Sequence, residues 1–228
     1  LMRTGFPYVQ LKLGASLDGR TAMASGESQW ITSPEARQDV QRLRAQSAAI
    51  LSTSATVLAD DPSLTVRWDE LDAETQRLYP RDNLRQPLRI LLDSQNRITP
   101  QHRVVQQPGA TWLARLQADE QAWPQDVEQF ICPAHGGGVD LVVMMMLLAK
   151  RQVNSIWVEA GASLAGALLQ AGLVDELILY IAPKLLGDNG RGLCHLPGLE
   201  RLADAPEFVF SDVRQVGPDL RLRLRAKH

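Results

Sequence analysis

Residues 155–172 read Ser-Ile-Trp-Val-Glu-Ala-Gly-Ala-Ser-Leu-Ala-Gly-Ala-Leu-Leu-Gln-Ala-Gly, and this stretch decides the fold class. Its apolar residues 156–158 are typical of a short buried strand. The small residues that follow predict a helix over residues 163–171, with Gly172 just beyond the helix end, where glycine is favoured. A strand that leads through a glycine turn into a helix indicates an α/β fold.

Glu159 and Gly161 lie between that strand and that helix. In open α/β sheets, ligands bind at the carboxyl ends of the strands, and a helix start with small side chains favours an anion. An acid at a strand end is costly to bury without a partner, which favours a ligand site. Ordinary turn chemistry and close helix packing explain the glycines equally well. Residues 161–166 match neither common nucleotide-binding fingerprint, so both interpretations stay open.

The composition excludes several classes of protein. The chain has 228 residues and a net charge of −2, so it has no basic excess that would favour nucleic acid. Two cysteines and four histidines show no disulfide or metal-ligand spacing, so we expect no metal site. No segment has the length of a membrane span and no signal peptide is visible, so we expect a cytoplasmic protein with no membrane partner. The first strand begins near Pro7, so we expect that the chain is cut from a longer one.

The remaining elements predict one domain over residues 1–228. Ser33, Pro34 and Glu35 are typical of a helix start, and residues 140–151 read as an apolar helix. A turn-rich loop is expected at 14–19, a short extended run at 63–67 and a surface excursion at 68–86. Strands are expected at 8–13, 48–52, 88–93, 111–114, 127–132 and 176–182, with an antiparallel pair at 208–216 and 220–224. We therefore expect a mostly parallel sheet with antiparallel C-terminal strands.

Several polar or aromatic residues are open to two interpretations. Lys12 lies near the end of its strand and reaches either solvent or an anion or hydroxyl of a substrate. Trp30 lies in a polar loop and covers either the core or a flat cofactor ring. Arg44 lies about 80° from the centre of the apolar stripe of its helix, so it faces either solvent or a cleft. Thr56 and Asp60 are four residues apart and share a face if they are helical.

Six ordered blocks of sequence resemble one family. They are Pro7-Tyr8-Val9-x-x-Lys12-x-Gly14-x-Ser16-x-Asp18-Gly19, Ser28-Gln29-Trp30-Ile31-Thr32, Thr56-Val57-Leu58-Ala59-Asp60-Asp61-Pro62-x-Leu64-Thr65-Val66-Arg67, Asp93-Ser94, Glu159-x-Gly161 and Ala182-Pro183-Lys184-x-x-Gly187. Together they resemble the reductase domain of the bifunctional riboflavin-biosynthesis deaminase/reductase, over essentially the whole chain. The H-x-E and P-C-x-x-C elements of a zinc deaminase are absent.

The resemblance implies a dihydrofolate-reductase-like three-layer sandwich, NADPH as cofactor and a homodimer. It implies reduction of 5-amino-6-(5-phosphoribosylamino)uracil to the ribitylamino compound, by hydride transfer from NADPH to ribose C1′. It also implies that the full-length protein joins this chain to an amino-terminal zinc deaminase domain.

The resemblance also assigns roles to residues. Those of the cofactor site are Gly14, Trp30, Thr56, Asp60, Ser94, Gly161, Ala162, Ser163, Leu164, Ala165, Gly166 and Ala167, with Arg97 a weaker candidate near the 2′-phosphate. Those of the substrate site are Lys12, Ser28, Arg44, Leu64, Arg67 and Glu159, with the arginines expected at the phosphate. Glu159 and Lys12 are the candidates for relaying the proton, and their pairing with each other is the structural alternative.

Two departures and two rival functions remain. Ser54 and Ala162 stand where the family usually has glycine. Ser54 is expected to narrow the approach to the cofactor, and Ala162 is expected to be harmless if its φ is negative. One rival is a dihydrofolate-type reductase acting on another pterin or pyrimidine. The other is a non-catalytic nucleotide-binding module.

Overall fold

The computed structural model describes residues 5–227. They divide into two compact units, one made of residues 5–8 and 41–158 and the other of residues 9–40 and 159–227. The single domain expected over residues 1–228 stays a prediction. No helix in the described range is long and apolar enough to cross a membrane.

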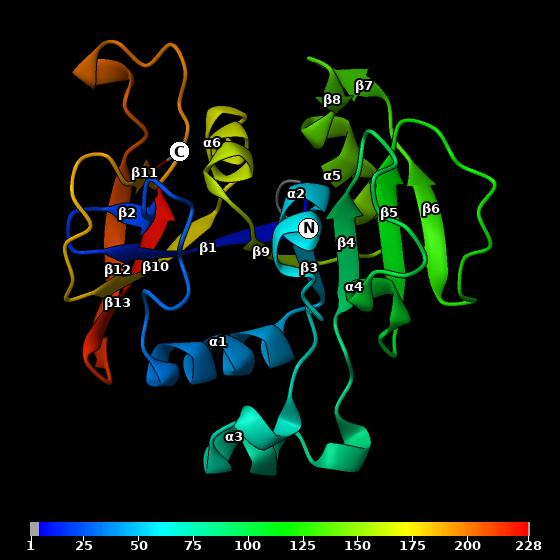
Figure 1. The fold of residues 1–228 in the computed structure, drawn as a ribbon, viewed down its shortest axis with the longest axis horizontal. Helices are drawn as coiled ribbons and strands as arrows, with labels where there is room; N and C mark the ends of the chain where they lie inside the picture. The colour runs from blue at the N-terminus through cyan, green and yellow to red at the C-terminus, as the bar shows by residue number, and fades with distance from the viewer. Residues whose placement is uncertain (1–4, 228) are drawn as a thin grey trace. The chain divides into compact units, whose positions relative to one another are not determined.

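The first unit contains a run of parallel strands. Their order is β9 (Ser155–Glu159), β3 (Ala49–Thr53), β4 (Leu88–Leu92), β5 (Thr111–Arg115) and β6 (Val127–Ile131). Figure 1 shows β4, β5 and β6 side by side. The central strands are mostly apolar, as in parallel sheets that are buried on both faces, and Leu51, Ile90 and Leu91 are fully buried.

Short helices connect these strands. They are α2 (Ser54–Asp60), α3 (Ala73–Leu78), α4 (Arg103–Gln106) and α5 (Leu141–Lys150), with 3₁₀ turns at Trp68–Glu70 and Arg81–Asn83. The helix expected from Asp140 onward is confirmed, and the Asp140 side chain caps it by accepting the Val143 N–H. The hairpin of β7 (Ala134–His135) and β8 (Gly138–Val139) was not expected.

The second unit combines parallel and antiparallel strands. β1 (Tyr8–Ser16) pairs in parallel with β10 (Glu176–Ala182), and β13 (Asp219–Ala226) then pairs antiparallel with β10 and with β12 (Phe208–Val216). Helix α6 (Ala162–Gln170) follows β9, and a two-stranded ribbon joins β2 (Arg20–Ala22) to β11 (Arg191–Gly192). Helix α1 (Pro34–Gln46) begins in this unit, and the Ser33 hydroxyl accepts the Ala36 N–H at its start.

The predicted fold class is confirmed: the strands are mostly parallel, with an antiparallel C-terminal pair. The sandwich layers of the dihydrofolate-reductase-like fold stay a prediction. Two local expectations were wrong. Residues 14–16 continue β1 instead of forming a loop, because they pair with Tyr180 to Ala182. The extended run expected at 63–67 is interrupted at Leu64, which has a φ of 50°.

Candidate functional site

Helix α6 begins with exposed backbone and no side-chain cap. Gly161 is the residue before the first helical turn and it is exposed, as is Ser163. Ala162 has no positive φ, so alanine is tolerated there, as expected. A helix start without a capping side chain leaves N–H groups available to an anion. The position is therefore compatible with the predicted role of residues 161–163.

Later residues of the same predicted set face inward. Leu164, Ala165 and Gly166 are buried. A Cβ atom on Gly166 would lie 1.7 Å from the carbonyl oxygen of His195, and the His195 N–H donates to Ala162 O at 2.9 Å. Gly166 is therefore required for close packing of the loop around His195 on α6. The packing interpretation holds at this glycine, while a cofactor role for 164–167 stays a prediction.

The predicted residues of β1 and β9 lie at strand positions. Lys12 and Glu159 are both half-buried, on β1 and at the end of β9. Gly14 lies on β1, where an added Cβ would come 3.3 Å from the methyl group of Thr32. Ser28 lies in the exposed loop after β2. These placements leave the predicted roles of all four residues untested.

Trp30 does not cover the core. Its side chain is 62% exposed, and the Arg37 guanidinium lies over the ring at 4.5 Å from the centroid. Lys184 donates from Nζ to the Trp30 carbonyl at 3.0 Å. The core interpretation of this tryptophan is therefore wrong, and its exposed ring remains compatible with contact to a flat ligand.

The turn after β1 is clamped to the segment that follows β10. The Asp18 carboxylate accepts bonds from the Ser16 hydroxyl and from the N–H groups of Leu186 and Gly187. The Ser16 hydroxyl, followed by these backbone donors, lowers the pKa of Asp18 to about 2. The clamp brings two of the family-like sequence blocks together within the second unit.

In the first unit, Thr56 and Asp60 lie one turn apart on α2, as predicted. The Thr53 hydroxyl caps this helix by accepting the Thr56 N–H at 3.2 Å. Ser54 is buried, and its hydroxyl accepts a hydrogen bond from Arg97 Nη2 at 2.9 Å. The hydroxyl that departs from the family pattern is thus engaged by Arg97.

The loop that carries Ser94 and Arg97 is fixed by a buried ion pair. Asp93 accepts the Arg97 and Ile98 N–H groups at 2.8 and 3.1 Å. Arg115 donates to the same carboxylate from Nε and Nη2, at 3.0 and 2.8 Å, and both side chains are fully buried. This anchor holds Ser94 half-buried and Arg97 exposed at the end of β4. Sequence reasoning missed Arg115, because nothing local to β5 indicates its partner.

The predicted phosphate partners already have contacts within the first unit. Arg44 is buried and donates from Nη1 to Thr65 O at 2.9 Å. Of the two surroundings expected for Arg44, solvent or a cleft, the structure therefore excludes solvent. Arg67 is exposed and forms a two-point ion pair with Glu70. Leu64 is buried. Sequence reasoning also missed Gln41 and Gln86, whose amides bond to the backbone of this segment.

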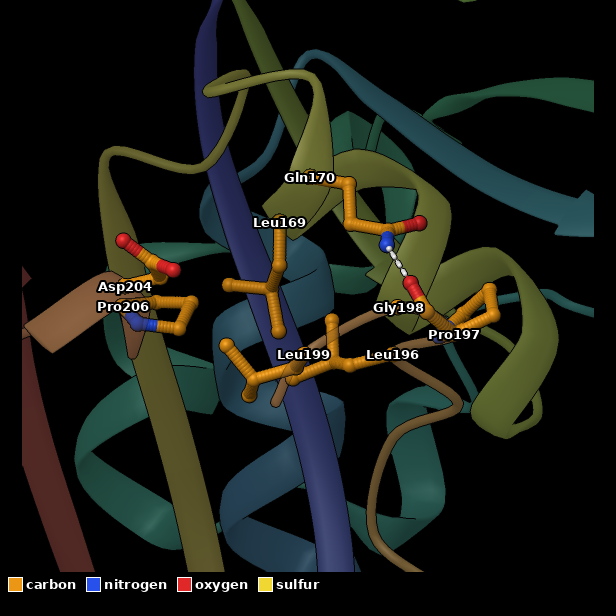
Figure 2. A pocket seen from close by; sticks show the side chains of 8 residues that line it. All are labelled: Leu169, Gln170, Leu196, Pro197, Gly198, Leu199, Asp204 and Pro206. Carbon is orange, nitrogen blue, oxygen red and sulfur yellow. Dashed lines mark hydrogen bonds between the residues drawn. The ribbon is translucent and has the colours of Figure 1, made fainter. Parts of the chain in front are cut away.

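Figure 2 shows a pocket at the opposite end of α6, away from the exposed helix start. It measures about 330 Å³, and Gln170 Nε2 donates to Pro197 O across one side of it at 2.9 Å. Its lining consists of Leu169, Gln170, Leu196, Pro197, Gly198, Leu199, Asp204 and Pro206. None of the predicted site residues lines it.

Each unit, taken by itself, offers groups that suit the phosphates of a dinucleotide in chemical terms. The second unit offers an uncapped helix start at Gly161, and the first offers a hydroxyl and a guanidinium on the anchored loop with Ser94 and Arg97. Backbone N–H groups, hydroxyls and guanidinium groups are the usual partners of phosphate oxygens.

Comparison with known proteins gives a consistent result. The chain is 73% identical over 223 residues to "Riboflavin biosynthesis protein RibD" of Escherichia coli K12, covering 98% of this chain and 61% of that protein. It is 41% identical over 205 residues to the "5-amino-6-(5-phosphoribosylamino)uracil reductase" of Buchnera aphidicola subsp. Acyrthosiphon pisum, covering 90% of this chain and 99% of that protein. The structure of Acinetobacter baumannii RibD matches with a TM-score of 0.81 and 38% identity, over 100% of this chain and 60% of that one. Residues 7–222 match the pattern of the RibD C-terminal domain, and the chain belongs to that family.

Proposed function

We propose that this chain reduces 5-amino-6-(5-phosphoribosylamino)uracil with NADPH, as a step of riboflavin biosynthesis. The observation that carries the proposal is the alignment with the Buchnera reductase, because the chain covers 99% of that protein. RibD of E. coli is longer, and the chain spans 61% of it. The activity of that longer protein therefore supports the proposal less directly.

NADPH, when bound, supplies the hydride that reduces C1′ of the substrate ribose. We assign the N–H groups of residues 161–163 to its pyrophosphate. Ser94 and Arg97 are assigned to the adenosine end, where the guanidinium suits a 2′-phosphate. Gly14, Trp30, Thr56 and Asp60 are assigned to the nicotinamide and its ribose, following the family resemblance.

The substrate phosphate is assigned to the exposed guanidinium of Arg67. Its present partner Glu70 is itself about half-exposed, and such surface pairs contribute little stability. A phosphate dianion therefore displaces Glu70 at small cost. Lys12 and Glu159 are assigned to the sugar that is reduced, where one of them relays the proton. Ser28, Arg44 and Leu64 complete the proposed substrate set.

A homodimer is also proposed, through the outer face of the C-terminal strands. Leu220 and Leu222 alternate on one face of β13, and Val213 lies opposite Leu222. Phe210, Val213 and Leu220 on this face are 61%, 59% and 42% exposed. Apolar groups gathered on one sheet face are typical of protein–protein contacts. Val213→Asp is expected to give monomers in light scattering, whereas the same change at exposed Leu202 leaves the mass unchanged.

Two further assignments follow from the resemblance. We propose that a zinc deaminase domain precedes this chain in its full-length protein, and that the reaction takes place in the cytoplasm. A dihydrofolate-type reductase of another substrate and a non-catalytic nucleotide-binding module are the rival functions.

The test of the function is NADPH oxidation by this chain with two candidate substrates, the phosphoribosylaminouracil and dihydrofolate. Oxidation that depends on the phosphoribosylaminouracil and is absent with dihydrofolate is expected. Turnover of dihydrofolate instead would favour the first rival. NADPH binding without any turnover would favour the second.

A further inference from the structure

The backbone N–H and C=O groups of residues 64–67 form no hydrogen bonds with a neighbouring strand in the described part of the chain. The segment contains Leu64 and Arg67, both assigned above to the substrate, and no helix or strand is formed over it. Leu64 and Val66 are buried, so the backbone N–H and C=O groups beside them require partners. Side chains from two distant parts of the first unit supply those partners.

Gln86 pairs with Val66 in the manner of a strand. Its Oε1 accepts the Val66 N–H at 2.8 Å, and its Nε2 donates to the Val66 carbonyl at 3.0 Å. One amide side chain thus satisfies both backbone groups of a single residue. The two bonds fix the peptide plane on each side of Val66.

Helix α1 holds the same segment from its buried face. Gln41 is 2% exposed, and its Oε1 accepts the Arg67 N–H at 2.9 Å. One turn later on that helix, Arg44 donates to the Thr65 carbonyl at 2.9 Å. The backbone of the segment is therefore held at three consecutive residues, 65, 66 and 67.

We propose that Gln86 and Gln41 are positioning residues that set the orientation of Leu64 and Arg67 for substrate binding. The inference rests on the proposed function for the identity of the substrate. It goes beyond that function because it makes the substrate affinity depend on two side-chain amides that do not contact the substrate and that act only through the backbone of residues 64–67. Removing either amide leaves the guanidinium of Arg67 chemically intact and releases the peptide that aims it.

The test uses Gln86→Met and Gln41→Met, which keep chain length and remove the amide. Gln46→Met is the matched control, because Gln46 is the exposed last residue of the same helix. We expect the KM for the phosphoribosylaminouracil to rise about five- to tenfold in both variants, since each loses one or two hydrogen bonds. The Kd for NADPH and the kcat at saturating substrate should stay within about twofold of the wild-type values.

A second readout needs no turnover. In the unliganded chain, Gln86→Met should speed amide hydrogen exchange at Val66, and Gln41→Met should speed it at Arg67, each about tenfold. The control variant should leave both rates unchanged, and the unfolding midpoints verify that all variants are folded.

The outcomes separate the two proposals. No turnover by the wild-type chain would overturn the proposed function, and with it the substrate part of this inference. Wild-type turnover with an unchanged KM in both variants would overturn the inference alone. Unchanged exchange at Val66 and Arg67 would also overturn it, because the amides would then not hold the segment.

Discussion

Replacing Arg115 with Met leaves the Asp93 carboxylate buried without its cation. Both side chains are 0% exposed, and Arg115 supplies two of the four hydrogen bonds that Asp93 accepts. Breaking a buried ion pair by removing one partner costs about 3–5 kcal/mol. The Arg97 and Ile98 N–H groups still hold the carboxylate, but the variant also removes the bonds from Arg115 to Gln129 and Ile98 O, so we expect a loss of about 3–5 kcal/mol. Denaturant unfolding followed by tryptophan fluorescence measures it.

The same variant should weaken NADPH binding, because Asp93 fixes the loop of Ser94 and Arg97. Arg115→Lys keeps the charge but not the two-point fork, so an intermediate loss of stability is expected. Arg201→Met is the control, since Arg201 forms an exposed ion pair with Asp204, and surface pairs of this kind contribute little stability. If Arg115→Met costs no more than this control, the buried pair does not anchor the loop and the reasoning is wrong.

Three further predictions concern single side chains. Gly166→Ala should lower the unfolding temperature clearly, because the added Cβ would overlap the His195 carbonyl. Gly161→Ala is the control, because an added Cβ there meets no atom within 4 Å, and it should leave the unfolding temperature unchanged. Equal effects of the two substitutions would contradict the packing role of Gly166. The Ser16 hydroxyl, followed by the Leu186 and Gly187 N–H groups, lowers the pKa of Asp18 from 3.8 to about 2. The stability that the ionised Asp18 contributes is therefore complete above pH 3.8 and is lost as the pH falls through about 2. An Asp18→Asn variant whose unfolding curve keeps the wild-type acid dependence would contradict this. Arg67→Ala should raise the substrate KM, because the lost charged contact contributes about 1.5–3 kcal/mol of substrate binding, and it should leave the NADPH Kd unchanged. A raised NADPH Kd with an unchanged substrate KM would refute the assignment.

Regular elements were predictable where apolar runs are long enough to require burial. The strand expected at 176–182 and the helix after Asp140 match the structure, because their side chains bury against a sheet. Gly14 to Ser16 were misplaced because small residues are typical of turns, yet their backbone pairs with β10. The local signal was overridden by a tertiary contact.

The roles proposed for the site residues come from the resemblance to a family, and they stay predictions. Gln41, Gln86 and Arg115 act by bonding to distant backbone or to a distant carboxylate, and their immediate sequence neighbours give no indication of this. At Gly166 two interpretations were left open, a cofactor contact and close packing of its helix, and the structure shows a loop carbonyl packed against this glycine. Hydrogen bonds and backbone contacts between residues far apart in the sequence were therefore the features that the sequence did not predict.

The measurement that tests the account most directly is the oxidation of NADPH by this chain, followed by its absorbance as the phosphoribosylaminouracil is added. We expect oxidation in proportion to the substrate added, with the ribitylamino compound as product. NADPH that stays reduced in the presence of substrate, or that is oxidised equally well with dihydrofolate, would contradict the proposed function.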